Sequence, residues 1–283
     1  MRILITGANG QLGCALQPML SGEALTLMDL PDFDLTDPSC EKHILAATPE
    51  VIFHLAAFTD VDGAERDPDR ARAVNVQGTT FVARAAQALR ARLIYVSTDY
   101  VFDGEKTTPY IEDDKPRPLN QYGLSKYEGE QAALTLCGNT LIVRTAWLYG
   151  YAGKNFVKTI MRLANETSVL DVVADQRGCP TYADDLAYAM KQLLTSDMRG
   201  ICHVTNSGSC TWHEFAEAIV QQMGHSTVVR PITTAQAGRL ARRPAYSVLS
   251  QERFAKCCAS LPHWQDALAR FMKRVPHLVS APG

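Results

Sequence analysis

Short apolar runs alternate with amphipathic stretches through the first half of the chain. The apolar runs indicate buried strands, and apolar residues spaced three and four apart indicate helices. We expect strands at residues 2–6, 24–29, 51–57, 93–97 and 141–144, and helices at 11–20, 43–48, 70–89 and 121–136. Because helices separate the strands, this order predicts an α/β fold with a Rossmann-type, doubly wound parallel sheet.

The pattern loosens after residue 146. Helices are expected at 155–163, 183–194 and 212–222, and strands at 169–173 and 202–206, whereas 231–250 carries prolines and arginines without a clear period. We therefore expect residues 1–146 to form the Rossmann domain and residues 147–283 to form a smaller, interwoven C-terminal lobe. Strands near 169–174 and 201–206 are expected to return to the main sheet.

Composition removes several classes of function. The 283 residues carry a net charge of −2 with mixed signs, which gives no electrostatic case for nucleic acid or a membrane surface as a partner. No apolar run approaches the roughly 18 residues of a membrane span, and the first strand begins where a signal peptide would lie. The eight cysteines contain no C-x-x-C pair, so we expect mostly structural, reduced cysteines and a cytoplasmic protein.

A glycine-rich turn follows the first expected strand. Gly7, Gly10 and Gly13 form a G-x-x-G-x-x-G motif between a strand and a helix, which is the position of a dinucleotide cradle. They permit a tight turn, close approach of backbone to a diphosphate, and close helix–strand packing. Asp29 ends the second strand, where a carboxylate accepts the ribose hydroxyls of NAD and repels the 2′-phosphate of NADP. We expect NADPH or NADH as cofactor, and Asp29, with no arginine beside it, favours NADH.

Thr98, Tyr122 and Lys126 are the candidate catalytic residues. Thr98 follows the fourth expected strand, at the carboxyl edge of the sheet, and Tyr122 and Lys126 share one face of a helix that Asn120 can cap. A phenol holds its proton until pH ~10, and we expect the neighbouring ammonium to lower the pKa of Tyr122. Beside a nicotinamide, these groups are suited to adding hydride to a ketone, which makes the protein an oxidoreductase.

Further motifs occur in order along almost the whole chain. They cover residues 56–65 (AAFTDVDGAE), 97–102 (STDYVF), 118–123 (PLNQYG), 144–147 (RTAW), 155–156 (NF), 175–181 (DQRGCPT) and 242–247 (RRPAYS). With these motifs the chain resembles the dTDP-4-dehydrorhamnose reductases, a family of extended short-chain dehydrogenase/reductases.

The resemblance implies that NAD(P)H reduces the C4 ketone of dTDP-4-dehydro-L-rhamnose, the last step of dTDP-L-rhamnose biosynthesis. It implies that Tyr122 protonates the alkoxide, that Lys126 holds the ribose, and that Thr98 bonds the C4 oxygen. Together with the glycine motif, it gives as cofactor-binding residues Gly7, Gly10, Gln11, Leu12, Gly13, Asp29, Asp34, Leu35, Ala57, Phe58, Thr59, Val96, Tyr122 and Lys126. The substrate-binding residues are Thr59, Val61, Thr98, Asp99, Tyr100, Tyr122 and Trp147, and the smaller lobe is expected to bind the nucleotide sugar.

Single residues help to distinguish reduction from the related reactions of this superfamily. Sugar dehydratases of this superfamily follow the threonine with Asp-Glu, whereas here Asp99 and Tyr100 follow Thr98, which disfavours elimination. A reductase or epimerase of another nucleotide-deoxysugar, or a non-catalytic regulatory subunit with this fold, stays open. Some relatives are dimers with magnesium bound by glutamates, and Ala15 stands in place of one of them. We therefore predict no metal, while a homodimer formed by other contacts remains an option.

Other polar and aromatic residues have two interpretations each. Trp147 is expected to face substrate, and Trp212 to be either a lid aromatic or a core residue. The pair Arg242 and Arg243 either binds a diphosphate or forms a solvated turn. His54 is expected to be a core histidine with satisfied hydrogen bonds. The acids of residues 60–65 are expected to cap a helix.

Overall fold

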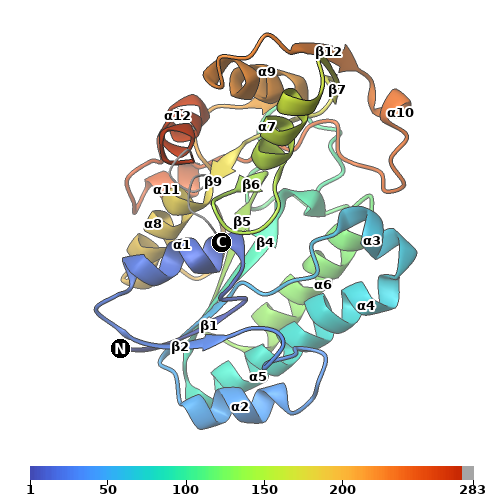
Figure 1. Cartoon of the computed structure of the whole chain (residues 1–283). Coiled ribbons are helices and arrows are strands. Elements are labelled where there is room, and N and C mark those ends of the chain that lie inside the picture. The colour runs from blue at the N-terminus through green and yellow to red at the C-terminus, as the bar shows by residue number, and fades with distance from the viewer. Residues whose placement is uncertain (276–283) are drawn as a thin grey trace.

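The computed structural model describes residues 1–275 and contains a six-stranded parallel sheet (Figure 1). Its strands are β1 (Arg2–Thr6), β2 (Ala24–Met28), β3 (Val51–His54), β4 (Arg92–Thr98), β5 (Thr140–Thr145) and β10 (Gly200–His203), in the order β10-β5-β4-β3-β1-β2. The carboxyl ends of β1 to β5 therefore meet at one edge, where doubly wound sheets bind ligands. The predicted Rossmann-type fold is confirmed.

Helices cover both faces of this sheet (Figure 1). Helices α1 (Gln11–Met19) and α8 (Ala183–Leu194) pack on one face, and α2 (Cys40–Ala47), α5 (Thr79–Leu89) and α6 (Gln121–Leu136) pack on the other. Because side chains alternate along a strand, Ile3 and Ile5 belong to the core beneath α1, while Leu4 belongs to the core beneath α5. The two cores hold the sheet edge at a fixed place.

A smaller lobe with its own apolar core lies above the carboxyl edge in Figure 1. It contains α7 (Phe156–Glu166), α9 (Trp212–Gln222), α12 (Trp264–Arg274) and a parallel pair of strands, β7 (Val169–Val173) and β12 (Val228–Ile232). Short pairs, β6 (Leu148–Tyr149) with β9 (Thr181–Tyr182) and β8 (Arg177–Gly178) with β11 (Cys210–Thr211), join the segments, and α10 (Thr234–Ala237) and α11 (Glu252–Ala255) are single turns.

The expected strand near 169–174 does form, but its return to the main sheet is wrong. Its side chains are alternately exposed and buried, whereas every residue of β5 is buried. A strand with one buried face suits a two-layer lobe, and a central strand of a doubly wound sheet needs two. The strand expected at 202–206 does join the main sheet, as β10.

The long helix expected at 70–89 is divided into α4 (Pro68–Arg72), a π-helical turn (Ala73–Gly78) and α5. The π-helical turn contains Asn75, a buried residue whose amide bonds both the N–H and the carbonyl of Phe58, at 2.8 and 3.1 Å. Such turns occur mostly at functional sites. Two helices, α3 (Val61–Arg66), which precedes α4, and α12, were not expected from the sequence. Each begins at a polar capping residue, Asp60 for α3 and His263 for α12.

Five of the eight cysteines, at 40, 137, 179, 202 and 210, are buried, as expected for core residues, and all eight are free thiols. Within residues 1–275 no helix combines the length and the apolar character needed to cross a membrane.

One ion pair is enclosed between α6 and β5. Arg144 donates two hydrogen bonds to Glu130, at 2.8 and 2.7 Å, and the two side chains are 1% and 0% exposed. Buried charges are stable only when they are paired, so each residue depends on the other.

We predict that Glu130→Gln lowers the free energy of unfolding by ~3–5 kcal/mol, because it leaves the Arg144 guanidinium buried without a counter-charge. Glu166→Gln, in the exposed pair of Arg162 and Glu166, serves as the control and should cost less than ~1 kcal/mol. Urea unfolding of both variants measures the two losses in the free energy of unfolding. Equal losses would show that the buried pair stabilises the fold no more than the exposed pair does.

Candidate active site

The glycine-rich turn approaches neighbouring backbone closely. Gly7 has a φ of +70°, and a Cβ there would lie 2.6 Å from the amide nitrogen of Ala56. A Cβ on Gly13 would lie 2.4 Å from the carbonyl oxygen of Ala8. Neither position can accept a side chain, so the turn brings the start of α1 directly onto the ends of β1 and β3. The N–H groups at the start of a helix are an anion-binding site.

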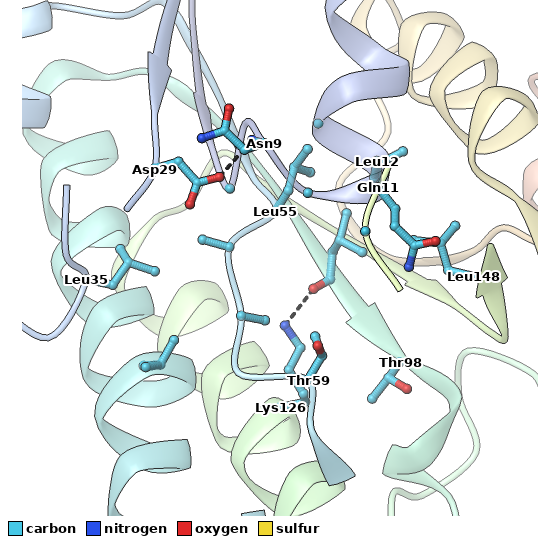
Figure 2. Close-up of a pocket in the computed structure, with 18 of the residues that line it drawn as sticks. Asn9, Gln11, Leu12, Asp29, Leu35, Leu55, Thr59, Thr98, Lys126 and Leu148 are labelled. Atoms are coloured by element: carbon cyan, nitrogen blue, oxygen red, sulfur yellow. Dashed lines mark hydrogen bonds between the residues drawn. The ribbon is translucent and has the colours of Figure 1, made fainter. Parts of the chain in front are cut away.

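A cavity of about 750 Å³ opens at this turn and runs along the carboxyl edge of the sheet (Figure 2). Nearly all of the expected cofactor residues line it: Gly7, Gly10, Gln11, Leu12, Gly13, Asp29, Asp34, Leu35, Ala57, Thr59, Val96, Tyr122 and Lys126. Of the expected substrate residues, Thr59, Thr98, Tyr122 and Trp147 line it. The cavity therefore joins the glycine-rich turn to the candidate catalytic residues, and its backbone cradle fits a dinucleotide.

Four expected contacts, Phe58, Val61, Asp99 and Tyr100, are not part of this lining. Phe58 is bonded through its backbone to Asn75, and Val61 begins α3. Asp99 is 2% exposed, and Tyr100 packs edge-on against Tyr122 with 5.8 Å between ring centroids. Their roles as contacts stay predictions.

Helix α6 places Tyr122 and Lys126 in the cavity. Asn120 caps the helix by accepting a 2.7 Å hydrogen bond from the N–H of Gly123, as the sequence predicts. A Cβ on Gly123 would lie 2.1 Å from the carbonyl oxygen of Tyr100, so the first turn of α6 packs directly on the segment that follows β4. That segment follows Thr98, and this packing brings all three candidate catalytic residues together.

Lys126 is buried and its ammonium group is held on two sides. Its Nζ donates a 2.7 Å hydrogen bond to the carbonyl of Val96, which is drawn as a dashed line in Figure 2, and lies 4.0 Å from the centre of the Tyr95 ring. Burial lowers the pKa of Lys126 to about 7, opposed by the charge of Glu130. Lys126 therefore lies at the site as expected, and its pKa is set by burial and by the charge of Glu130.

The expected lowering of the Tyr122 pKa is wrong. Burial raises the pKa of Tyr122 to about 12, and the nearby Thr98 hydroxyl only partly opposes this shift. The physical reason is that the protein around the phenol disfavours its anion more than neighbouring groups stabilise it. Tyr122 is therefore protonated at neutral pH, which is the state from which a phenol can donate a proton.

Thr98 is linked to a buried carboxyl group. Its Oγ1 donates a 3.0 Å hydrogen bond to Oδ1 of Asp99 and accepts one from the N–H of Tyr100. Burial raises the pKa of Asp99 from its ordinary value near 3.8 to about 6, although hydrogen bonds from Ser247 and Thr98 oppose the shift. Thr98 is therefore in direct contact with a carboxyl group whose pKa is raised by burial.

The geometry agrees with three comparisons. The family model for the RmlD substrate binding domain matches residues 1–276. A dTDP-4-dehydrorhamnose reductase of Sinorhizobium fredii is 42% identical over 96% of this chain and 97% of its own, and the spore coat polysaccharide biosynthesis protein SpsK of Bacillus subtilis is 38% identical over 96% and 97%. A crystal structure of dTDP-4-dehydrorhamnose reductase from Bacillus anthracis in complex with NADP superposes with a TM-score of 0.94, at 41% identity over 96% and 99% of the chains.

The chain belongs to the RmlD family. Asp29 lines the cavity beyond the end of β2, and its carboxylate accepts hydrogen bonds from the N–H groups of Asn9 and Leu30, at 2.7 and 2.8 Å. Arg70 of α4, to which the sequence analysis gave no role, lines the same cavity. Arg70 follows Asp29 by forty-one positions, and no motif connects the two. The bound NADP of the similar structure shows that this family does not exclude the 2′-phosphate.

Two tryptophans of this RmlD family member form a parallel stack. The rings of Trp147 and Trp212 lie 3.4 Å apart between centroids with 5° between their planes, and Trp147 adopts a left-handed φ of +48°. Trp147 lines the cavity, whereas Trp212 packs with the core of the smaller lobe. Trp212 is therefore the support of Trp147 and lies outside the cavity lining.

The remaining candidates are structural. His54 is fully buried, with hydrogen bonds to the hydroxyls of Thr6 and Thr79, which confirms a core histidine. Arg243 is paired with Asp62 at 3.1 Å, and neither Arg242 nor Arg243 lines the cavity. Of the three acids of residues 60–65, Asp60 caps α3 and Glu65 accepts from the N–H of Gln121 at the start of α6. Asp62 caps no helix in the described residues and instead accepts from the N–H of Ala241 and pairs with Arg243, so the expectation is wrong for this residue.

Because the folded-state pKa of Asp99 is raised, its protonated form contributes stability that is present below pH ~4 and is lost as pH rises through 6. We predict that the stability of the wild type, measured relative to Asp99→Asn, falls by ~2–3 kcal/mol between pH 4 and pH 7. Urea unfolding across this range tests it, with the exposed Asp197→Asn as the control. A flat difference would mean that Asp99 has an ordinary pKa.

Proposed function

We propose that this chain reduces the C4 ketone of dTDP-4-dehydro-L-rhamnose to dTDP-L-rhamnose with NADPH or NADH, the last step of dTDP-L-rhamnose biosynthesis. The observation that carries the proposal is one cavity that joins a dinucleotide cradle at Gly7 and Gly13 to Thr98, Tyr122 and Lys126. Sequence identity of about 40% to proteins named dTDP-4-dehydrorhamnose reductase, over nearly the whole chain, supports this choice of substrate. We also propose a cytoplasmic location, and a homodimer remains an expectation.

When bound, the cofactor supplies the hydride that adds to C4 of the ketosugar. Tyr122 then donates its proton to the C4 oxygen as negative charge develops there, and it is replenished from solvent. This role requires a phenol that is protonated at neutral pH, in agreement with the raised pKa of Tyr122.

Thr98 and Lys126 have supporting roles in this proposal. Thr98, at the end of β4, gives the C4 oxygen a second hydroxyl partner and keeps the carbonyl aimed at Tyr122. Lys126 is fixed by Val96 beneath the cavity, so it can hold the ribose hydroxyls and place the nicotinamide beside C4. Tyr100 in place of a second carboxylate leaves elimination without its base.

We predict that Tyr122→Phe lowers kcat by ~10²-fold or more while the Kd for NADPH stays unchanged, because only the proton donor is removed. Oxidation of NADPH and of NADH, followed by absorbance with dTDP-4-dehydro-L-rhamnose, gives kcat, and identification of dTDP-L-rhamnose confirms the product.

The matched control is Tyr127→Phe, on the same helix but outside the cavity lining, which should keep wild-type turnover. Undiminished turnover of Tyr122→Phe would refute the assignment of the proton donor. If the wild type binds NADPH but reduces no ketosugar of this kind, the substrate assignment fails and another nucleotide-deoxysugar becomes the candidate.

A further inference from the structure

The loop between β6 and α7 forms part of the cavity wall. Gly153, Lys154 and Asn155 of this loop line the cavity, and no sequence motif assigned a role to Lys154. Lys158, one turn into α7, fixes the loop through hydrogen bonds from its Nζ to the carbonyls of Tyr151 and Gly153. Lys154 is exposed, and within residues 1–275 it forms no ion pair.

This loop joins the starts of two helices. Asn155 is the N-cap of α7, and its amide Nδ2 donates a 3.0 Å hydrogen bond to Oε1 of Gln11, the first residue of α1. Figure 2 shows Gln11 extending toward Leu148 of β6, the strand that leads into the loop. The N-terminus of each helix carries a partial positive charge. Lys154 adds a full positive charge at the place where the two meet.

The charges that line the cavity are unevenly distributed. The lining carboxylates are Asp29 and Asp34, which belong to the segment at the end of β2, away from the loop. Of the lining cations, Lys126 is buried and bonded to Val96, and Arg70 belongs to α4, whereas Lys154 is exposed in the loop that Asn155 joins to the start of α1. A cofactor and a nucleotide sugar each bring a diphosphate, and a polyanion is attracted to an end of the cavity where one lysine lies beside two helix N-termini.

We propose that Lys154 is a diphosphate-binding residue that closes over the start of α1, with Asn155 and Gln11 holding its loop in register. The proposal rests on the proposed use of the cavity by a dinucleotide and a nucleotide sugar. The chemistry recognised is a diphosphate, and the two sources, NADPH and the thymidine nucleotide, are separated by experiment.

The experiment measures Kd by calorimetry for NADPH and for dTDP, with wild type, Lys154→Met and the control Lys191→Met. Lys191 is exposed on α8 and lies outside the cavity lining. Lys154→Met should weaken one or both ligands by about five- to tenfold, as expected for a charge-assisted contact open to solvent. The loss should shrink as salt rises, whereas Lys191→Met should bind both ligands like the wild type.

The ligand that loses affinity identifies the diphosphate. Loss for NADPH alone assigns Lys154 to the cofactor, loss for dTDP alone assigns it to the sugar nucleotide, and loss for both assigns it to the space between them. Unchanged Kd for both ligands would overturn the proposal. Since both measurements are of binding, failure of the ketosugar to react would refute the proposed substrate without affecting this test.

Discussion

Close backbone packing at the carboxyl edge of the sheet is the constraint on which the site depends. Gly7 touches the backbone of Ala56 and Gly13 touches that of Ala8, at distances that exclude even a methyl group. These contacts place the start of α1 against the ends of β1 and β3, and residues 10–13 of this turn line the cavity. The position of the dinucleotide cradle is therefore determined by backbone, and the surrounding side chains only refine it.

The same kind of contact positions the catalytic helix. A Cβ on Gly123 would lie 2.1 Å from the carbonyl of Tyr100, and one on Gly129 would lie 2.4 Å from the carbonyl of Asn75. Helix α6 therefore lies directly on the segment after β4 and on the π-helical turn, and the buried pair of Glu130 and Arg144 joins its far side to β5. Small residues along one face and a paired charge on another fix both the depth and the rotation of α6. Lys126 can reach the carbonyl of Val96 only because both are fixed.

Local signals predicted most of this arrangement. The glycine spacing, the cap at Asn120 and the helical pair of Tyr122 and Lys126 depend on neighbours in sequence, and the structure has the glycine-rich turn, the cap and α6 as expected. Contacts between distant segments left no such signal. Arg70 and Lys154 are ordinary surface residues in the sequence and reach the cavity only through the fold. The pairing of β7 with β12 rather than with the main sheet depends on which lobe covers it.

The expected lowering of the Tyr122 pKa is wrong because burial outweighs the neighbouring groups that would lower it. From sequence, an ammonium four residues away suggests a stabilised phenolate, but the pKa of a group reflects all of its surroundings. In this fold the same burial raises the pKa of Tyr122 and lowers the pKa of Lys126, so both side chains are pushed toward their neutral forms. A neutral phenol suits a reaction in which hydride arrives with the cofactor and the protein must supply the proton. Proton donation leaves a Tyr122 phenolate that this burial disfavours, so the phenol must regain a proton from solvent in each turnover.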